Sequence, residues 1–129
     1  VDPPLMQRMI NVAHSEKDAD FISNRLLWSF PLGLSADIIS RKAIEWCDKN
    51  LVKPEDRELF ACYVRDHPEQ FNVIPIINDE DLSRHTWTVD EPEDVVFMQR
   101  LFGSLYVEGK CFGMHEVLNF LTNENPIHS

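Results

Sequence analysis

Short apolar runs alternate along this chain with longer segments whose apolar residues recur every three or four positions. The short runs are typical of β-strands, and the longer segments are typical of amphipathic helices. The sequence predicts strands at residues 19–24, on both sides of a bend at 30–34, at 71–78 and at 85–90. It predicts helices near the start of the chain, after Ser40 through Ile44 and Trp46, from Pro54 to His67, and along the stripe from Val95 to Leu105. A last short helix is expected around Val117, Leu118 and Leu121. An alternation of this kind indicates an α/β fold in which helices cover a sheet.

Capping residues and prolines mark several of the expected ends. Asp2 and Ser40 can each accept a hydrogen bond from an amide in the first turn of the helix that follows. Pro54 suits the first turn of another helix, because an amide hydrogen there would have no partner. Pro75 removes a donor from the run 71–78, so we expect that strand at the edge of the sheet.

Length and charge limit the classes of function. A chain of 129 residues with 43% hydrophobic content can bury one ordinary core. A formal net charge of -10 repels nucleic acid and anionic membrane surfaces, so we expect neither as a partner. No apolar run approaches the roughly 20 residues that cross a bilayer. We therefore expect a cytoplasmic protein with no membrane insertion. The three cysteines show no spacing typical of a zinc site or a disulfide framework.

The acidic cluster around Pro92 has two interpretations. Asp90 with Glu93 three positions later fits a capping box, and acids at a helix start complement the helix dipole. The alternative is that the cluster holds a cation against a phosphate. Magnesium usually needs carboxylates that converge from separate elements, so the residues alone favour capping.

Seven short motifs occur in an order that resembles the C-terminal half of a known family. These motifs are DFISN (20–24), FPLGL (30–34), DRE (56–58), DLS (81–83), WTVDEPED (87–94), CF (111–112) and NP (125–126). The family comprises the cytidylyltransferase-like proteins of spore coat polysaccharide biosynthesis, which are relatives of the sugar-acid cytidylyltransferases, including CMP-Kdo synthetase. WTVDEPED is the most specific of the seven motifs.

This resemblance implies a three-layer, Rossmann-like nucleotidyltransferase fold, of which residues 1–129 form the C-terminal half. It implies that a sugar acid attacks CTP with the help of Mg²⁺, that pyrophosphate leaves, and that the protein is a homodimer. In such families, the glycine- and arginine-rich triphosphate loop and an acidic metal ligand lie in the N-terminal half. Because neither is present here, we expect this chain alone to be inactive.

The resemblance also assigns roles to individual residues. It implies that Asp90 faces a metal ion, while Glu93 and Asp94 chiefly stabilise the helix start. The bend at 30–34 is either a simple turn in which glycine permits close backbone approach, or part of the sugar site. Likewise, the pair at 57–58 is either an exposed helix pair or a grip on a carboxylate or phosphate. The substrate-binding residues implied by the second alternatives are Asn24, Pro31, Gly33, Arg57 and Glu58.

Some positions depart from the family pattern. This chain has Gly33-Leu34-Ser35 where relatives show Gly-Leu-Asp. It has the sequence RELFAC at 57–62 where relatives show REHVTP. These changes favour a rival hypothesis, in which the chain is a non-catalytic interaction or dimerisation module that has kept the fold of its relatives.

Overall fold

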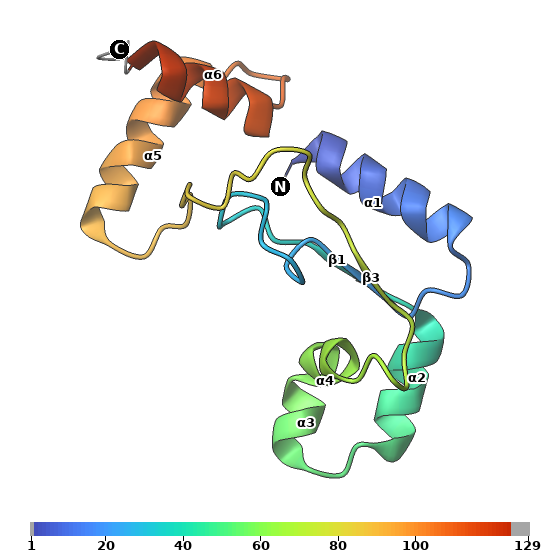
Figure 1. The fold of residues 1–129 in the computed structure, drawn as a ribbon. Helices are drawn as coiled ribbons and strands as arrows, with labels where there is room; N and C mark the ends of the chain where they lie inside the picture. Colours follow the sequence, from blue (N-terminus) through green and yellow to red (C-terminus); the bar gives the residue numbers. More distant parts are fainter. Residues whose placement is uncertain (1, 125–129) are drawn as a thin grey trace.

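The computed structural model describes residues 2–124, so the NP motif at 125–126 lies outside the described residues. The chain contains both helices and strands, as the sequence predicted, but they do not alternate one by one (Figure 1). The elements are α1 (Pro3–Ser15), β1 (Phe21–Ser23), β2 (Asp37–Ile39), α2 (Arg41–Asn50), α3 (Pro54–Glu58), α4 (Phe60–Asp66), β3 (Val73–Pro75), α5 (Pro92–Leu105) and α6 (Met114–Glu124).

The described strands form one small mixed sheet in the order β2-β1-β3. β1 is central, and it pairs antiparallel with β2 and parallel with β3. Pro75 therefore lies in an edge strand, which confirms the prediction from the missing amide hydrogen.

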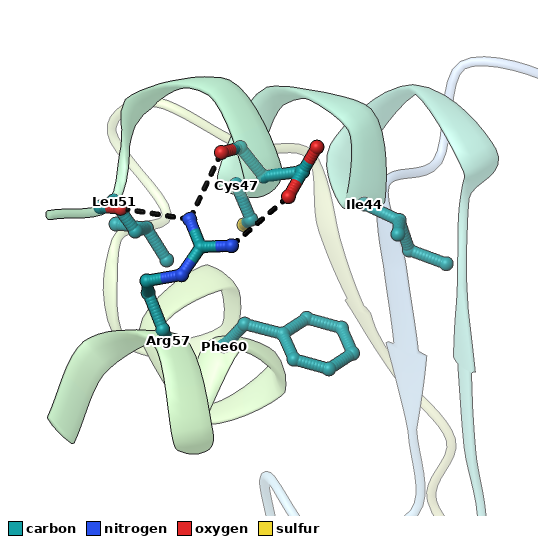
Figure 2. A pocket seen from close by; sticks show the side chains of 6 residues that line it. Ile44, Cys47, Leu51, Arg57 and Phe60 are labelled. Carbon is teal, nitrogen blue, oxygen red and sulfur yellow. Dashed lines mark hydrogen bonds and ion pairs between the residues drawn. The ribbon is translucent and has the colours of Figure 1, made fainter. Parts of the chain in front are cut away.

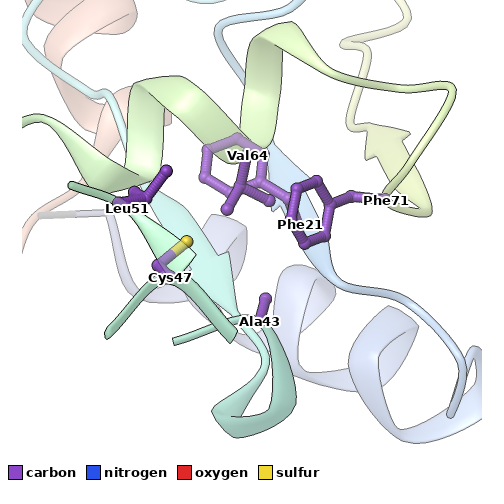
Figure 3. Packing of buried hydrophobic residues seen from close by; sticks show 6 residues of the cluster. All are labelled: Phe21, Ala43, Cys47, Leu51, Val64 and Phe71. Carbon is purple, nitrogen blue, oxygen red and sulfur yellow. The ribbon is translucent and has the colours of Figure 1, made fainter. Parts of the chain in front are cut away.

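Successive side chains of a strand point to opposite faces of the sheet. In this sheet both faces are covered by helices. Ile22 packs with Leu5 and Met9 of α1 on one face. Its neighbour Phe21 packs on the other face with side chains of α2 and α4, including the fully buried Val64 (Figure 3). The result is the three-layer α/β architecture that the family resemblance implied.

Two of the predicted caps are present. Ser40 Oγ accepts a hydrogen bond from the amide of Ala43 at the start of α2. Asp2 Oδ2 accepts one from the amide of Leu5 in α1. The other carboxylate oxygen, Oδ1, accepts a hydrogen bond from the amide of Met114 at 2.7 Å, at the start of α6. One buried carboxylate thus holds the starts of two helices that are distant in sequence.

The strand expected after the bend at 30–34 forms as β2, but the one expected before it does not, because residues 25–28 form a turn. The bend itself and the segment 85–90, which was expected to be a strand, form no strand either. These segments meet only in an isolated parallel bridge between Leu32 and Thr86. The amide of Leu32 donates to the carbonyl of His85, and the amide of Trp87 donates to the carbonyl of Leu32. The pairing stops there because the chain turns at Gly33, where φ is +108°.

The expected single helix at 54–67 is also divided. Leu59 has φ of -108° and ψ of 37°, outside the helical range, and it separates α3 from α4. Within the described residues, no helix is long and apolar enough to span a bilayer.

Candidate functional site

Asn24 follows the central strand and fixes the bend at 31–36. Its side chain is 1% exposed. Nδ2 donates to the carbonyl of Leu34 at 2.8 Å, and Oδ1 accepts from the amide of Ala36 at 2.9 Å. Both amide atoms thus hold the backbone of the bend. The predicted substrate role of Asn24 stays a prediction, and its contacts show what the residue does for the fold.

Gly33 lies against the first residue of the WTVDEPED motif. A Cβ atom on Gly33 would stand 2.7 Å from the carbonyl oxygen of Trp87, closer than real Cβ atoms approach other atoms. The positive φ also favours glycine. Pro31, which is fully buried, accepts a hydrogen bond from the amide of Leu34 and closes the turn around Gly33. The structure thus brings Asn24, Pro31 and Gly33 together at one bend.

A cavity of about 570 Å³ adjoins this bend. Gly33, Leu34 and Trp87 form one wall, and α5, α6 and the segment that connects them form the others, together with Pro3 of α1. The lining side chains from 98–117 are mostly apolar: Met98, Leu101, Phe102, Tyr106, Lys110, Cys111, Phe112, Met114 and Val117. Lys110 is the one basic residue among the described residues that line it. The size and the apolar walls are typical of a small-molecule site.

The acidic cluster at residues 90–94 follows Trp87 along the chain and includes the start of α5. Asp94, the third residue of α5, stabilises the helix start, because its Oδ2 accepts hydrogen bonds from the amides of Asp90 and Glu91 at 2.9 and 2.8 Å. These two bonds, led by the one from Asp90, lower the pKa of the Asp94 carboxyl. The N-cap is Glu91, so the Asp90–Glu93 pair is not the capping box. The helix starts one residue later than that pattern predicts, because Pro92 occupies its first position.

Asp90 contributes one exposed carboxylate, three residues after the cavity-lining Trp87. No group of three histidine, cysteine, aspartate or glutamate residues within 2–124 could hold a metal ion. Magnesium at phosphate sites takes one or two carboxylates together with substrate phosphates. The described residues therefore fit one ligand of such an ion, and they do not form a complete metal site.

Arg57 and Glu58 lie elsewhere, in α3. The Arg57 guanidinium donates to the carbonyls of Asp48 and Leu51 and also forms an ion pair with the Asp48 carboxylate at 3.0 Å (Figure 2). It thereby satisfies carbonyl groups at the end of α2 that have no partner within the helix. A separate pocket of about 180 Å³ adjoins Arg57, but neither Arg57 nor Glu58 lines the large cavity.

The cavity-lining residues of α5 and α6 were not predicted as site residues. Their signal in the sequence was the apolar stripe that includes Met98, Leu101 and Phe102, which is typical of core packing. In the structure only Leu101 of these three is buried, while Phe102 is 51% exposed. The stripe therefore faces a cavity as well as a core, and helical spacing alone does not distinguish the two.

Comparison with known proteins gives one strong structural match. No protein-family profile and no curated protein sequence matches this chain. The solved structure of a cytidylyltransferase from Leptospira borgpetersenii serovar Hardjo-bovis (strain JB197) matches 98% of it, with a TM-score of 0.80 and 22% identity. The chain spans about half, 52%, of that solved chain. The match confirms a nucleotidyltransferase-like α/β fold, present here as a partial domain.

His85, which lies next to Trp87 of the cavity wall, has a ring nitrogen without a hydrogen-bond partner in the described part of the chain. Its Nε2 atom is buried without a hydrogen-bond partner among the described residues, and its ring lies 5.7 Å from that of Trp87. Burial lowers the pKa of His85, and the nearby Arg84 lowers it further, while Glu80 opposes the shift. The protonated imidazole is thus less favourable in the folded chain than in the unfolded chain.

The folded chain should therefore lose stability in mild acid. Because the unfolded chain binds the proton more readily, the free energy of unfolding falls as the pH drops below about 6.5 and levels off below the folded pKa. Urea unfolding between about pH 5 and 8 measures this slope. His85→Gln should flatten it, whereas the control His14→Gln, at an exposed position of α1, should keep it. Equal slopes in the wild type and His85→Gln would contradict this assignment.

Proposed function

We propose that this chain is part of an enzyme that transfers a cytidylyl group from CTP to a sugar acid. The observation that carries the proposal is the match of almost the whole chain to a solved cytidylyltransferase. The position of the WTVDEPED motif, whose first residue Trp87 lines the large cavity, gives further support. The resemblance to spore coat proteins supports surface polysaccharide biosynthesis in the cytoplasm as the setting.

In this reaction a sugar hydroxyl attacks the α-phosphorus of CTP, a new P–O bond forms, and pyrophosphate leaves. Such chemistry depends on alignment of the reactants and on neutralisation of phosphate charge. In this proposal, Asn24 and Gly33 give the bend a fixed shape, and Trp87 and Leu34 limit the space beside it. With Lys110 as the one cation among the described residues of the cavity lining, we expect the triphosphate to be held mainly by the rest of the domain.

Asp90 is the proposed contribution of this chain to metal binding. Its carboxylate is exposed, and its amide is fixed by Asp94, so its position at the start of α5 is defined. A bound Mg²⁺ would neutralise charge on the phosphate oxygens. The remaining ligands would be the phosphates, water and residues outside this chain.

The rival function is a non-catalytic interaction or dimerisation module. It is favoured by Arg57, whose guanidinium is already occupied at the end of α2. The apolar lining of the cavity also favours it, because sugar acids need polar partners. The two hypotheses differ in one measurable property, the turnover of CTP.

The test uses a polypeptide in which this chain is joined to the remainder of the domain. We expect it to release pyrophosphate from CTP in the presence of Mg²⁺ and a sugar acid, with slower release from ATP, GTP or UTP. The isolated chain should release none, because it does not supply the groups that neutralise a triphosphate. No turnover by the complete domain would favour the module, and robust turnover by the isolated chain would contradict the partial-domain interpretation.

Asp90→Asn distinguishes metal binding from a helix-start role. Asparagine keeps the backbone amide that donates to Asp94 but lacks the charge that binds Mg²⁺. In the complete domain we therefore expect at least a tenfold loss of pyrophosphate release, equivalent to about 1.4 kcal/mol in the barrier, with little change in thermal unfolding. The matched control is Glu93→Gln, which removes an exposed charge from the first turn of α5 and should have a much smaller effect. Unchanged turnover in Asp90→Asn would exclude Asp90 as the ligand.

We also propose self-association through the apolar region from Leu26 to Ile39. Leu27 and Trp28 are 56% and 50% exposed, and large neighbouring apolar side chains of this kind mark interaction surfaces.

Leu27→Gln should therefore shift the protein toward monomer. The matched control is Leu59→Gln, which replaces a leucine of similar exposure, 59%, between α3 and α4. Light scattering over a concentration series measures the average mass. A wild type that stays monomeric at high concentration would contradict the proposal, as would an equal effect of the two substitutions.

A further inference from the structure

The segment 82–87 is held to the bend by backbone hydrogen bonds around one histidine. The amide of Leu32 donates to the carbonyl of His85 at 2.9 Å, and the amide of Trp87 donates to the carbonyl of Leu32 at 2.7 Å. These bonds form an isolated bridge, so no neighbouring ladder reinforces them. The cavity wall at Trp87 therefore keeps its place only while His85 stays against the bend.

The ring of His85 is enclosed by the chain's own atoms. Its Nε2 atom is buried and has no hydrogen-bond partner within residues 2–124, and the ring lies 5.7 Å from that of Trp87. Because described atoms already cover Nε2, a residue outside this chain cannot reach it unless the segment moves. A neutral imidazole tolerates this position with Nε2 unprotonated, whereas an imidazolium would bury a charged N–H donor without a partner.

The charged groups around this ring do not offset an added positive charge. Arg84 and Glu80 act on the ring, and they form an exposed ion pair with each other at 3.7 Å. The stretch 26–36, which contains the opposing Leu32, has no titratable side chain. Burial lowers the pKa of His85 and Arg84 lowers it further, while Glu80 opposes them. The imidazolium is therefore favourable only where the ring is open to water.

We propose that His85 is a pH-sensitive switch: when its ring takes up a proton, the segment 82–87 separates from Leu32, and the cavity wall at Trp87 opens. The proton comes from solvent and binds Nε2, and the hydrogen bonds that join Leu32 to the segment break. Release of the proton restores the pairing. The opening is confined to this segment, because the bridge lies outside the two cores that hold the sheet and its helices. This inference depends on the pairing of the two segments and not on the proposed reaction.

Amide exchange in the native state tests the switch. The amides of Leu32 and Trp87 report on the pairing, and the amide of Val64, at a fully buried position of α4, reports on unfolding of the whole chain. Because the opening takes up one proton, protection at Leu32 and Trp87, corrected for the intrinsic rate at each pH, should fall by up to about tenfold per pH unit below about pH 6.5. Dilute urea should not change this loss, because a local opening exposes little surface, whereas it should accelerate exchange at Val64.

Two glutamine variants separate the switch from other effects of acid. His85→Gln cannot take up a proton in this range, so protection at Leu32 and Trp87 should no longer depend on pH. The control His14→Gln, at an exposed position of α1, should keep the dependence. An NMR titration of the His85 ring in the wild type follows the proton itself and needs no variant. When this ring is half protonated, Leu32 should have lost nearly all of its protection.

Three results would each rule out the switch. The first is protection at Leu32 and Trp87 that does not change with pH, or that persists while the His85 ring titrates. The second is an unchanged pH dependence in a folded His85→Gln variant. The third is exchange at Leu32 that rises with urea in parallel with exchange at Val64, since this would identify unfolding of the whole chain as the response to acid.

Discussion

The geometry of the candidate site depends on one buried amide side chain at the end of the central strand. β1 is held in place by cores on both faces of the sheet, so Asn24 begins from a fixed position. Its donor and acceptor then hold Leu34 and Ala36. This orders the bend, brings Gly33 against Trp87, and forms the wall of the large cavity. Leaving such a buried group unpaired costs about 1–3 kcal/mol, so the bend and the strand end stabilise each other.

Two carboxylates set the positions of the helices that complete the large cavity. Asp94 binds the amides of Asp90 and Glu91 and fixes the start of α5. Asp2 binds the amides of Leu5 and Met114, and so it holds α6 to the start of α1. The acidic cluster therefore contains one carboxylate that stabilises the helix start and one that is exposed to solvent. Asp94 is used by the backbone, whereas Asp90 is exposed and available to a ligand.

Local chemistry predicted much of the fold. The caps at Asp2 and Ser40 and the missing amide hydrogen of Pro75 are local features, so they could be predicted from neighbouring residues. The second hydrogen bond of Asp2, from Met114, could not. The segment 85–90 was predicted wrongly as a strand, because its pairing depends on a distant turn at Gly33. The contacts of Arg57 could not be predicted either, since they require α2 and α3 to be placed in space. For the same reason, the stripe at Met98 and Phe102 predicted a helix but gave no sign of the cavity.

The most direct test of this account is amide exchange at Trp87, whose amide donates to the carbonyl of Leu32 across the bend. If Asn24 orders the bend, Asn24→Ala should accelerate exchange at Trp87 and at Ala36. Exchange at Val64, in the core of α4, should be slowed as strongly as in the wild type, which would show that the sheet and its helices remain folded. Unchanged protection of Trp87 in a folded Asn24→Ala variant would contradict the central role given to this side chain.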